Sequence, residues 1–80
     1  MRIRLKTIND VNSFTKACSD YYSGDIDVKQ NRQVIDGKSV LGIYSLDLTR
    51  PIDVTISTPD ASIEHDFYCF IRKWRINEEE

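Results

Sequence analysis

The sequence predicts an α+β fold, an open-faced β-sandwich in which a four-stranded antiparallel sheet carries three helices on one face. Apolar residues alternate with polar ones in some segments and recur at helical spacing in others, in the order β-α-β-β-α-β-α. Because every strand-like segment alternates, one face of the sheet should be covered and the other open. A length of 80 residues, with 40% hydrophobic and 30% charged, suits one folded domain. We place this domain at residues 1–76, before an acidic tail at residues 77–80.

Residues 2–6 alternate apolar side chains with arginine and lysine, which predicts a strand with a charged outer face. A helix is predicted next, over roughly residues 9–23. We expect its N-cap at Asn9 or Asp10 and its end at Gly24. The apolar residues at helical spacing are Val11, Phe14, Ala17, Cys18, Tyr21 and Tyr22.

Period-two alternation returns at residues 25–28 and again at 33–36, and the polar residues 30–32 between them are typical of a tight turn. These segments therefore predict a β-hairpin. After Gly37 breaks the second strand, the crowding of apolar residues predicts a short amphipathic helix with Ser39 as its N-cap.

The last third of the chain contains a loop, a strand and a helix. Residues 47–51 form the expected loop, since the residue before a proline is disfavoured in a helix. Residues 52–57 alternate most regularly and predict a strand. The final helix is expected to start at Thr58-Pro59, because proline suits the first helical position. Its apolar stripe is Ile63, Phe67, Phe70, Ile71 and Trp74.

The second hairpin strand and the short helix resemble the signature of HPr, the histidine-containing phosphocarrier of the bacterial sugar phosphotransferase system. In that family a strand is followed by Lys-Ser, an apolar pair, glycine, two more apolar residues and Ser-Leu. The resemblance continues without a gap through residues 53–56 and back to residues 25–26, and the predicted element order is also the HPr order. It implies the HPr-like form of the open-faced sandwich. The matching segment is Ile35-Asp36-Gly37-Lys38-Ser39-Val40-Leu41-Gly42-Ile43-Tyr44-Ser45-Leu46.

The resemblance implies a phosphoryl-accepting histidine at the N-terminal end of the first helix, with an arginine and helix N–H groups to bind the phosphate. Aligned without a gap, the histidine position falls on Ile8, the arginine position on Asp10 and the following proline on Val11. Isoleucine has no nucleophilic atom, and a carboxylate repels phosphate. We therefore expect that the carrier chemistry is lost.

The family match at Ser39 is intact. As a helix cap, its hydroxyl would contribute about 1 kcal/mol to stability. In Gram-positive relatives of the family, a dedicated kinase phosphorylates the matching serine, and the phosphorylated form binds a transcription regulator. A phosphate on Ser39 would lie beside Lys38, at the positive end of the helix dipole. Two roles stay open: a cap alone, or a cap that is also a regulatory phosphorylation site.

HPr proteins contact their partners through an apolar patch that corresponds to Val40, Leu41 and Tyr44. Core packing by Val40, Ile43 and Leu46 is the alternative role of this segment. One side of so short a helix should remain exposed, and we expect Leu41 and Tyr44 to be the exposed members.

Two charged residues complete the expected partner-binding set. Lys38 precedes the cap, and Asp47 stands where a glycine is common in the family. Aspartate tolerates the left-handed backbone conformation better than most residues, so the fold should survive while the contacts of the adjacent loop change.

Composition argues against several classes of protein. Eleven basic residues oppose thirteen acidic ones, and the net charge of −2 argues against a nucleic-acid binder. The two cysteines, Cys18 and Cys69, form no CxxC pair, and we expect both to be reduced and largely buried, although a bridge between neighbouring helices is not geometrically excluded. No signal peptide and no apolar run of membrane length is recognised, so we expect a cytoplasmic protein without membrane contact.

His65 is the single histidine, and it falls in the last predicted helix, away from the family's site. The neighbouring carboxylates of Asp60, Glu64 and Asp66 do not give metal-ligand spacing with a second histidine. We therefore interpret this region as a charged helix face with a surface histidine, and we expect neither a metal nor a cofactor.

The leading hypothesis is an HPr-like, non-enzymatic regulatory or binding module related to the phosphotransferase system. Its expected partners are proteins: enzymes of that system, a serine kinase or a transcription regulator. The alternative is a functional phosphocarrier that uses an unrecognised acceptor. A third possibility is an HPr-type fold that serves in an unrelated assembly.

Overall fold

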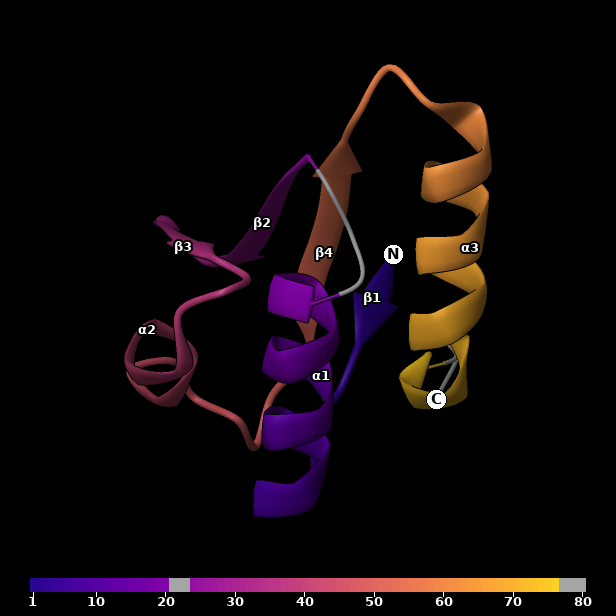
Figure 1. Cartoon of the computed structure of the whole chain (residues 1–80). Helices are drawn as coiled ribbons and strands as arrows, with labels where there is room; N and C mark the ends of the chain where they lie inside the picture. Colours follow the sequence, from indigo (N-terminus) through magenta and orange to yellow (C-terminus); the bar gives the residue numbers. More distant parts are fainter. Residues whose placement is uncertain (21–23, 77–80) are drawn as a thin grey trace.

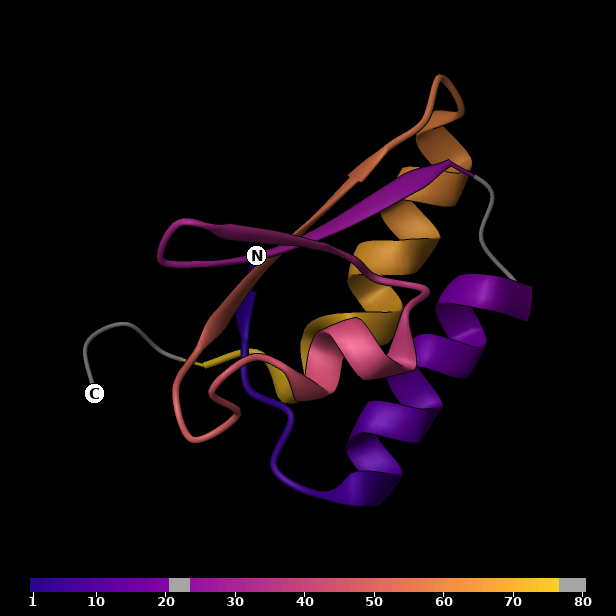
Figure 2. The same cartoon turned by 90° about the vertical axis from the view of Figure 1, so that its left-hand side faces the viewer.

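The computed structural model describes residues 1–20 and 24–76, which form an α+β fold with an open, four-stranded antiparallel sheet (Figure 1). The strand order is β1-β4-β2-β3, and the helices lie on one face of the sheet (Figures 1 and 2). Tyr21, Tyr22 and the acidic tail lie outside the described residues. The elements are β1 (Arg2–Ile3), α1 (Ile8–Asp20), β2 (Asp25–Gln30), β3 (Gln33–Asp36), α2 (Val40–Tyr44), β4 (Ile52–Ser57), α3 (Ala61–Ile71) and the 3-10 turn η1 (Arg72–Trp74).

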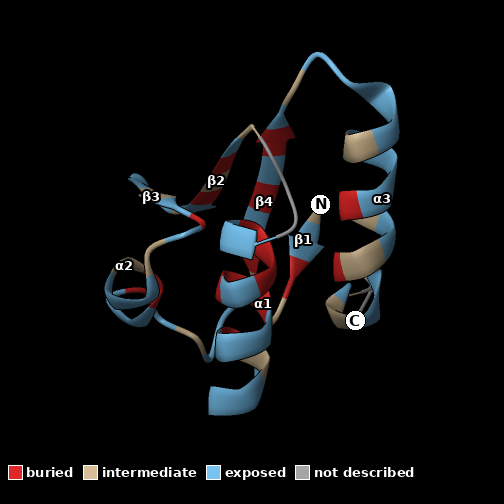
Figure 3. Cartoon of the chain, in the orientation of Figure 1, coloured by how far each residue is buried: buried red, intermediate tan, exposed pale blue. Residues whose placement is uncertain are grey.

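The two central strands explain why the sheet has one covered face. In β4, Ile52, Val54 and Ile56 are buried, whereas the residues between them are exposed (Figure 3). In β2, Ile26 and Val28 are buried in the same way. Since side chains of a strand point to opposite faces in turn, these apolar residues all face the helices. The open face and the predicted strands over residues 25–28, 33–36 and 52–57 are confirmed, whereas β1 spans only Arg2–Ile3 of the predicted residues 2–6.

A single hydrophobic core fills the space between the sheet and the helices. Phe14 of α1 and Phe67 of α3 are fully buried, and the Trp74 ring meets the Phe14 ring edge-on at a centroid distance of 6.2 Å. Burying each such large apolar side chain contributes about 1.5–3 kcal/mol. The core comprises Ile3, Leu5, Val11, Phe14, Cys18, Ile26, Val28, Ile43, Leu46, Ile52, Val54, Ile56, Phe67 and Ile71.

The β1 edge of the sheet is covered by the end of the described chain, which the sequence did not predict. Ile3 forms an isolated antiparallel bridge with Arg75. The Arg4 N–H donates to the Trp74 carbonyl at 3.0 Å, and the Ile76 N–H donates to the Arg2 carbonyl at 3.2 Å. These bonds satisfy the backbone groups that a two-residue edge strand would otherwise leave unpaired.

The predicted cap of α1 and the predicted start of α3 were wrong by two or three residues, whereas α1 begins at Ile8, close to the expected residue 9. In α1, Thr7 acts as the cap in place of Asn9 or Asp10: its Oγ1 accepts from the Asp10 N–H at 3.0 Å and its carbonyl from the Val11 N–H at 3.1 Å. In α3, the N-cap is Asp60. Pro59 therefore precedes the cap instead of opening the helix. In both cases a side-chain oxygen that reaches the free N–H groups sets the boundary.

The prediction that both cysteines are buried was half wrong. Cys18 is fully buried in α1, but Cys69 is exposed on α3. The buried positions of α3 are Phe67 and Ile71, one helical turn apart. Cys69 lies midway between them in sequence, and a residue two positions away from a buried one faces the opposite side of a helix. Both thiols are free.

Candidate functional site

The short helix α2 begins at the cap predicted from the sequence. Ser39 has an extended backbone (φ −96°, ψ 105°), and its Oγ accepts from the Gly42 N–H at 3.1 Å while its carbonyl accepts from the Ile43 N–H at 3.0 Å. Asp36 holds the segment before α2 in place: its carbonyl accepts from the Ser39 N–H at 3.0 Å, and its carboxylate accepts from the Lys38 N–H at 2.9 Å. The Ser39 side chain is half-buried and keeps its own proton available as a donor.

Glycine at position 42 lets α2 lie directly against β3. A Cβ atom at Gly42 would stand 2.5 Å from Ile35 Cγ2, so that the Ile35 side chain would have to move, and 3.0 Å from Ser39 Oγ, which is a tight contact. The glycine therefore fixes both the helix position and the cap geometry. This residue was part of the family signature, but its packing role was not predicted.

The apolar patch of α2, defined here as Val40, Leu41 and Tyr44, is exposed. Leu41 is 84% exposed, Tyr44 43% and Val40 39%, whereas Ile43 of the same helix is fully buried. The predicted exposure of Leu41 and Tyr44 is confirmed. Of the residues proposed as core alternatives, only Ile43 and Leu46 are in the core. A cluster of exposed apolar residues beside a polar cap is typical of a binding surface.

Asp47 fixes the loop after α2 through its hydrogen bonds. The Asp47 N–H donates to Gln30 Oε1 at 2.8 Å, and Gln30 Nε2 donates to the Asp47 carbonyl at 2.7 Å. Its carboxylate accepts from the Thr49 N–H at 3.0 Å and hydroxyl at 2.6 Å, and these bonds lower the pKa of Asp47. Its φ is not positive, since Asn31 is the one described non-glycine residue with a left-handed φ. The left-handed tolerance considered for Asp47 is therefore not used.

The N-terminus of α1, where the family resemblance places the histidine and arginine, is arranged differently. Ile8 is 68% exposed and offers no nucleophile. The Asp10 carboxylate accepts from the Lys6 N–H at 3.2 Å. Burial raises the pKa of Asp10, but hydrogen bonds from the Trp74 side chain and from Lys6 and Thr7 outweigh it, so the pKa lies below 3.8. A carboxylate of this chain thus accepts hydrogen bonds from donors beside this helix start.

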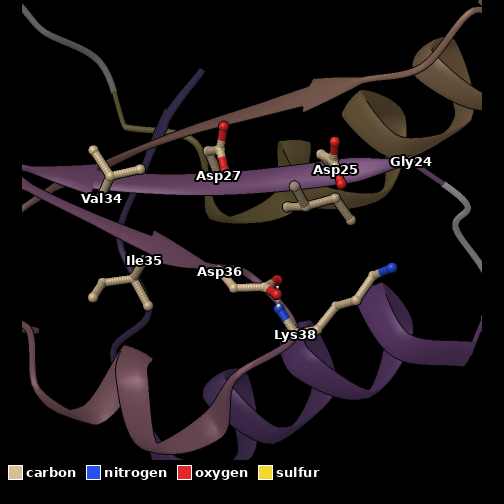
Figure 4. Close-up of a pocket in the computed structure, with 8 residues that line it drawn as sticks. Gly24, Asp25, Asp27, Val34, Ile35, Asp36 and Lys38 are labelled. Carbon is tan, nitrogen blue, oxygen red and sulfur yellow. Dashed lines mark hydrogen bonds between the residues drawn. The ribbon is translucent and has the colours of Figure 1, made fainter.

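Lys38 directly precedes the Ser39 cap and is exposed. Its side chain extends toward α1 (Figure 4), and its charge acts on Cys18. Burial raises the pKa of the Cys18 thiol to about 12, with Lys38 opposing the rise and Asp36 adding to it. Cys18 is therefore a protonated, unreactive core thiol.

An open pocket of about 240 Å³ lies over β2 and β3, next to the start of α2 (Figure 4). Carboxylates dominate its polar lining, with Lys38 at one end. This pocket was not predicted, although alternation along the hairpin places its aspartates on the open face of the sheet. The lining residues are Gly24, Asp25, Ile26, Asp27, Val34, Ile35, Asp36 and Lys38.

His65 is exposed on α3, as expected for a surface histidine, and its Nε2 lies 3.5 Å from Cys69 Sγ one turn later. Asp60, five residues earlier, serves as the helix cap. Within residues 1–20 and 24–76, no group of three or more His, Cys, Asp or Glu side chains is arranged to hold a metal ion. None of the helices in the same ranges is long and apolar enough to cross a bilayer.

No family model matches this chain, and neither a curated protein nor a solved structure is similar to it. The assignment of a function therefore depends on the residues of the α2 surface and of the α1 start.

Proposed function

We propose that the chain is an HPr-like protein of the open-faced sandwich type that has no phosphoryl-acceptor histidine and works as a binding or regulatory module. The exposed apolar patch beside the Ser39 cap carries this proposal. Leu41, at 84% exposure, contributes nothing to the core, whereas Ile43 in the same helix is fully buried. Stability alone therefore accounts for Ile43 but not for a leucine at position 41.

The start of α1 supports the loss of phosphocarrier chemistry. Phosphoramidate formation needs an imidazole and donors for the phosphate. Here Ile8 supplies no nucleophile, and the Asp10 carboxylate takes the Lys6 N–H at 3.2 Å. A second negative charge at this position would be repelled by Asp10. Binding at α2 is then the remaining activity of the family for which this chain has matching residues.

Regulation by phosphorylation of Ser39 is the second part of the proposal. Phosphorylation would add close to two negative charges at the edge of the apolar patch. It should weaken a partner that buries Leu41 and Tyr44, and strengthen one that offers arginines. Because the Ser39 hydroxyl already accepts from Gly42 N–H at 3.1 Å, the phosphate oxygens could keep this hydrogen bond.

Two phosphorylation assays test the proposal directly. Incubation with phosphoenolpyruvate and the first phosphotransferase enzyme should leave the protein unlabelled. Acid-labile label on His65 would contradict this part and favour the alternative phosphocarrier. Incubation with an HPr serine kinase and ATP should label the protein, and Ser39→Ala should abolish the label. Label that persists in Ser39→Ala, or no label at all, would reduce Ser39 to a helix cap.

The binding surface is tested with two matched variants. Leu41→Ser and Ile8→Ser each remove an exposed apolar side chain, at 84% and 68% exposure, but only Leu41 belongs to the patch. Binding to immobilised HPr serine kinase or to an HPr-responsive transcription regulator should be lost in Leu41→Ser and kept in Ile8→Ser. Equal binding by both variants would remove the patch from the proposal.

A further inference from the structure

The free edge of β3 has its backbone groups directed away from the sheet. The Gly37 N–H donates to the Ile26 carbonyl at 2.8 Å, which identifies the pairs that exchange hydrogen bonds within the hairpin. Two residues back along the register, Ile35 and Val28 form the next hydrogen-bonded pair. Val34 and Lys29, which lie between these two pairs, form a pair that is not hydrogen-bonded. Because bonded and non-bonded pairs alternate in an antiparallel ladder, the N–H and C=O of Val34 point outward.

This edge is poorly protected for an edge strand. Residues 33–36 contain neither proline nor lysine, and Val34 at the middle of the strand is an apolar side chain at 59% exposure. The opposite edge, β1, is covered by the bridge between Ile3 and Arg75. An uncovered edge with an exposed apolar residue is a template for another strand.

One row of charges on the open face near Val34 is unbalanced within one copy. On the open face, Asp27 lies directly opposite Asp36 in the β2–β3 register. Like charges directly opposite are destabilising. Elsewhere on this face the charges alternate, because Asp53 of β4 lies opposite Arg2 on one side and Lys29 on the other. The row of the sheet that contains Asp27 and Asp36 therefore has no basic residue to offset its two negative charges.

We infer that the β3 edge pairs antiparallel with β3 of a second copy of this chain, about a two-fold axis at Val34. In this register Val34 lies opposite Val34 of the second copy, and their outward N–H and C=O groups bond reciprocally. Arg32, the turn residue that directly precedes β3, then lies at the level of Asp36 of the second copy, at the other end of that strand. Arg32 of each copy thereby adds a positive charge to the Asp27–Asp36 row of the other copy.

The helix α2 does not have to contact the second copy for this pairing. It lies on the same side of the molecule as the β3 edge in both views (Figures 1 and 2). A two-fold axis perpendicular to the joined sheet places both copies of α2 on the same face of it. One short ladder buries much less than the roughly 1,200 Å² of a stable interface, so the dimer should form only at high concentration. The inference does not rest on the proposed function.

Sedimentation equilibrium at rising concentration tests this interface with charge-swapped variants. Arg32→Asp alone places two carboxylates opposite each other and should weaken the dimer about tenfold or more. Asp36→Arg alone should do the same with two guanidinium groups. An equimolar mixture of the two variants should dimerise again, because the copy with two carboxylates on this edge then faces the copy with two guanidinium groups. Far-UV circular dichroism verifies that each variant is folded.

Val34→Lys is the second, independent variant, because the exposed Val34 side chain can be changed without loss of the core. A lysine at the axis faces its own copy and should abolish the dimer. Leu41→Ser separates the pairing from partner binding, since the strand ladder should persist without Leu41 while binding to the proposed partners is lost. A monomer up to millimolar concentration, or a dimer insensitive to Val34→Lys and Arg32→Asp, would overturn the inference.

Discussion

The starts of α1 and α2 are both capped by a hydroxyl group, but the residues that follow the two caps differ. Each helix has a hydroxyl cap, Thr7 for α1 and Ser39 for α2, at 3.0 and 3.1 Å from the N–H that it receives. At α1 the next charged side chain, Asp10, turns back to donors of its own chain. At α2 the next side chains, Val40 and Leu41, turn outward without a partner in the core. A helix start can thus be closed by its own residues or remain available to another molecule.

The largest effect should separate the two faces of α2. Ile43→Ala removes a fully buried side chain and should cost about 2–5 kcal/mol in the free energy of unfolding. Leu41→Ala removes a side chain that is 84% exposed and should change stability by less than about 0.5 kcal/mol. Urea denaturation of both variants measures the difference. Comparable losses of stability in the two variants would mean that Leu41 is a core residue, and α2 would then have no apolar side chain free for a partner at this position.

Close packing of α2 against β3 should give the next effect. Gly42→Val places branched carbons where Ile35 Cγ2 would be only 2.5 Å from the new Cβ, and overpacking of this kind costs about 1–3 kcal/mol. Thermal unfolding followed by circular dichroism gives the change. An unchanged or raised melting temperature would show that Ile35 moves aside at no cost, and that glycine is not required at this position.

The two caps should be nearly equal in energy. Ser39→Ala and Thr7→Ala each leave a helix N–H without its side-chain acceptor, and each should cost about 1 kcal/mol. Ser39→Asp retains an acceptor and should restore most of the loss, with Ser39→Asn as its uncharged control. Urea midpoints of the four variants measure these changes. A loss confined to Ser39→Ala would mean that Asp10 alone suffices to hold the start of α1.

The smallest effect concerns pH and the carboxylate of α1. The pKa of Asp10 is lowered in the folded state, so its contribution to stability is present above its ordinary value of 3.8 and is lost as the pH falls through the lower folded value. Asp10→Asn should therefore be less stable than the parent at neutral pH, and the difference should vanish in acid. Urea midpoints between pH 2 and 7 provide the measurement. A difference that stays constant across this range would show that the charge has no role.

Much of the fold could be predicted because alternation and helical spacing report directly on burial. The strand over residues 52–57 was recognised from its pattern, and every second residue of β4 is buried. The cap at Ser39 was recognised because one side-chain oxygen suffices to make it. Exposure of Leu41 and Tyr44 followed from the width of a five-residue helix.

What escaped prediction depends on contacts between distant segments. The pairing of Ile3 with Arg75 has no local sequence pattern, because the sequence of residues 72–76 predicts the end of a helix. The exposure of Cys69 depends on which side of α3 faces the sheet, and a cysteine fits either side by composition. The sequence does not distinguish Thr7 from Asn9 and Asp10 as the cap of α1, because all three residue types suit an N-cap. The acidic pocket over β2 and β3 required the hairpin register, which brings Asp27 opposite Asp36.

The covered edge of β1 also has a kinetic consequence. Both partners of this strand are remote in sequence: Ile3 pairs with Ile52 on one side and with Arg75 on the other. Loop closure over such spans is slow, whereas the β2–β3 hairpin closes through a two-residue turn. We therefore expect the hairpin to form early and β1 to dock last, after residues 74–76 have reached their place. Substitutions at Ile3 should accordingly speed unfolding while leaving the folding rate almost unchanged.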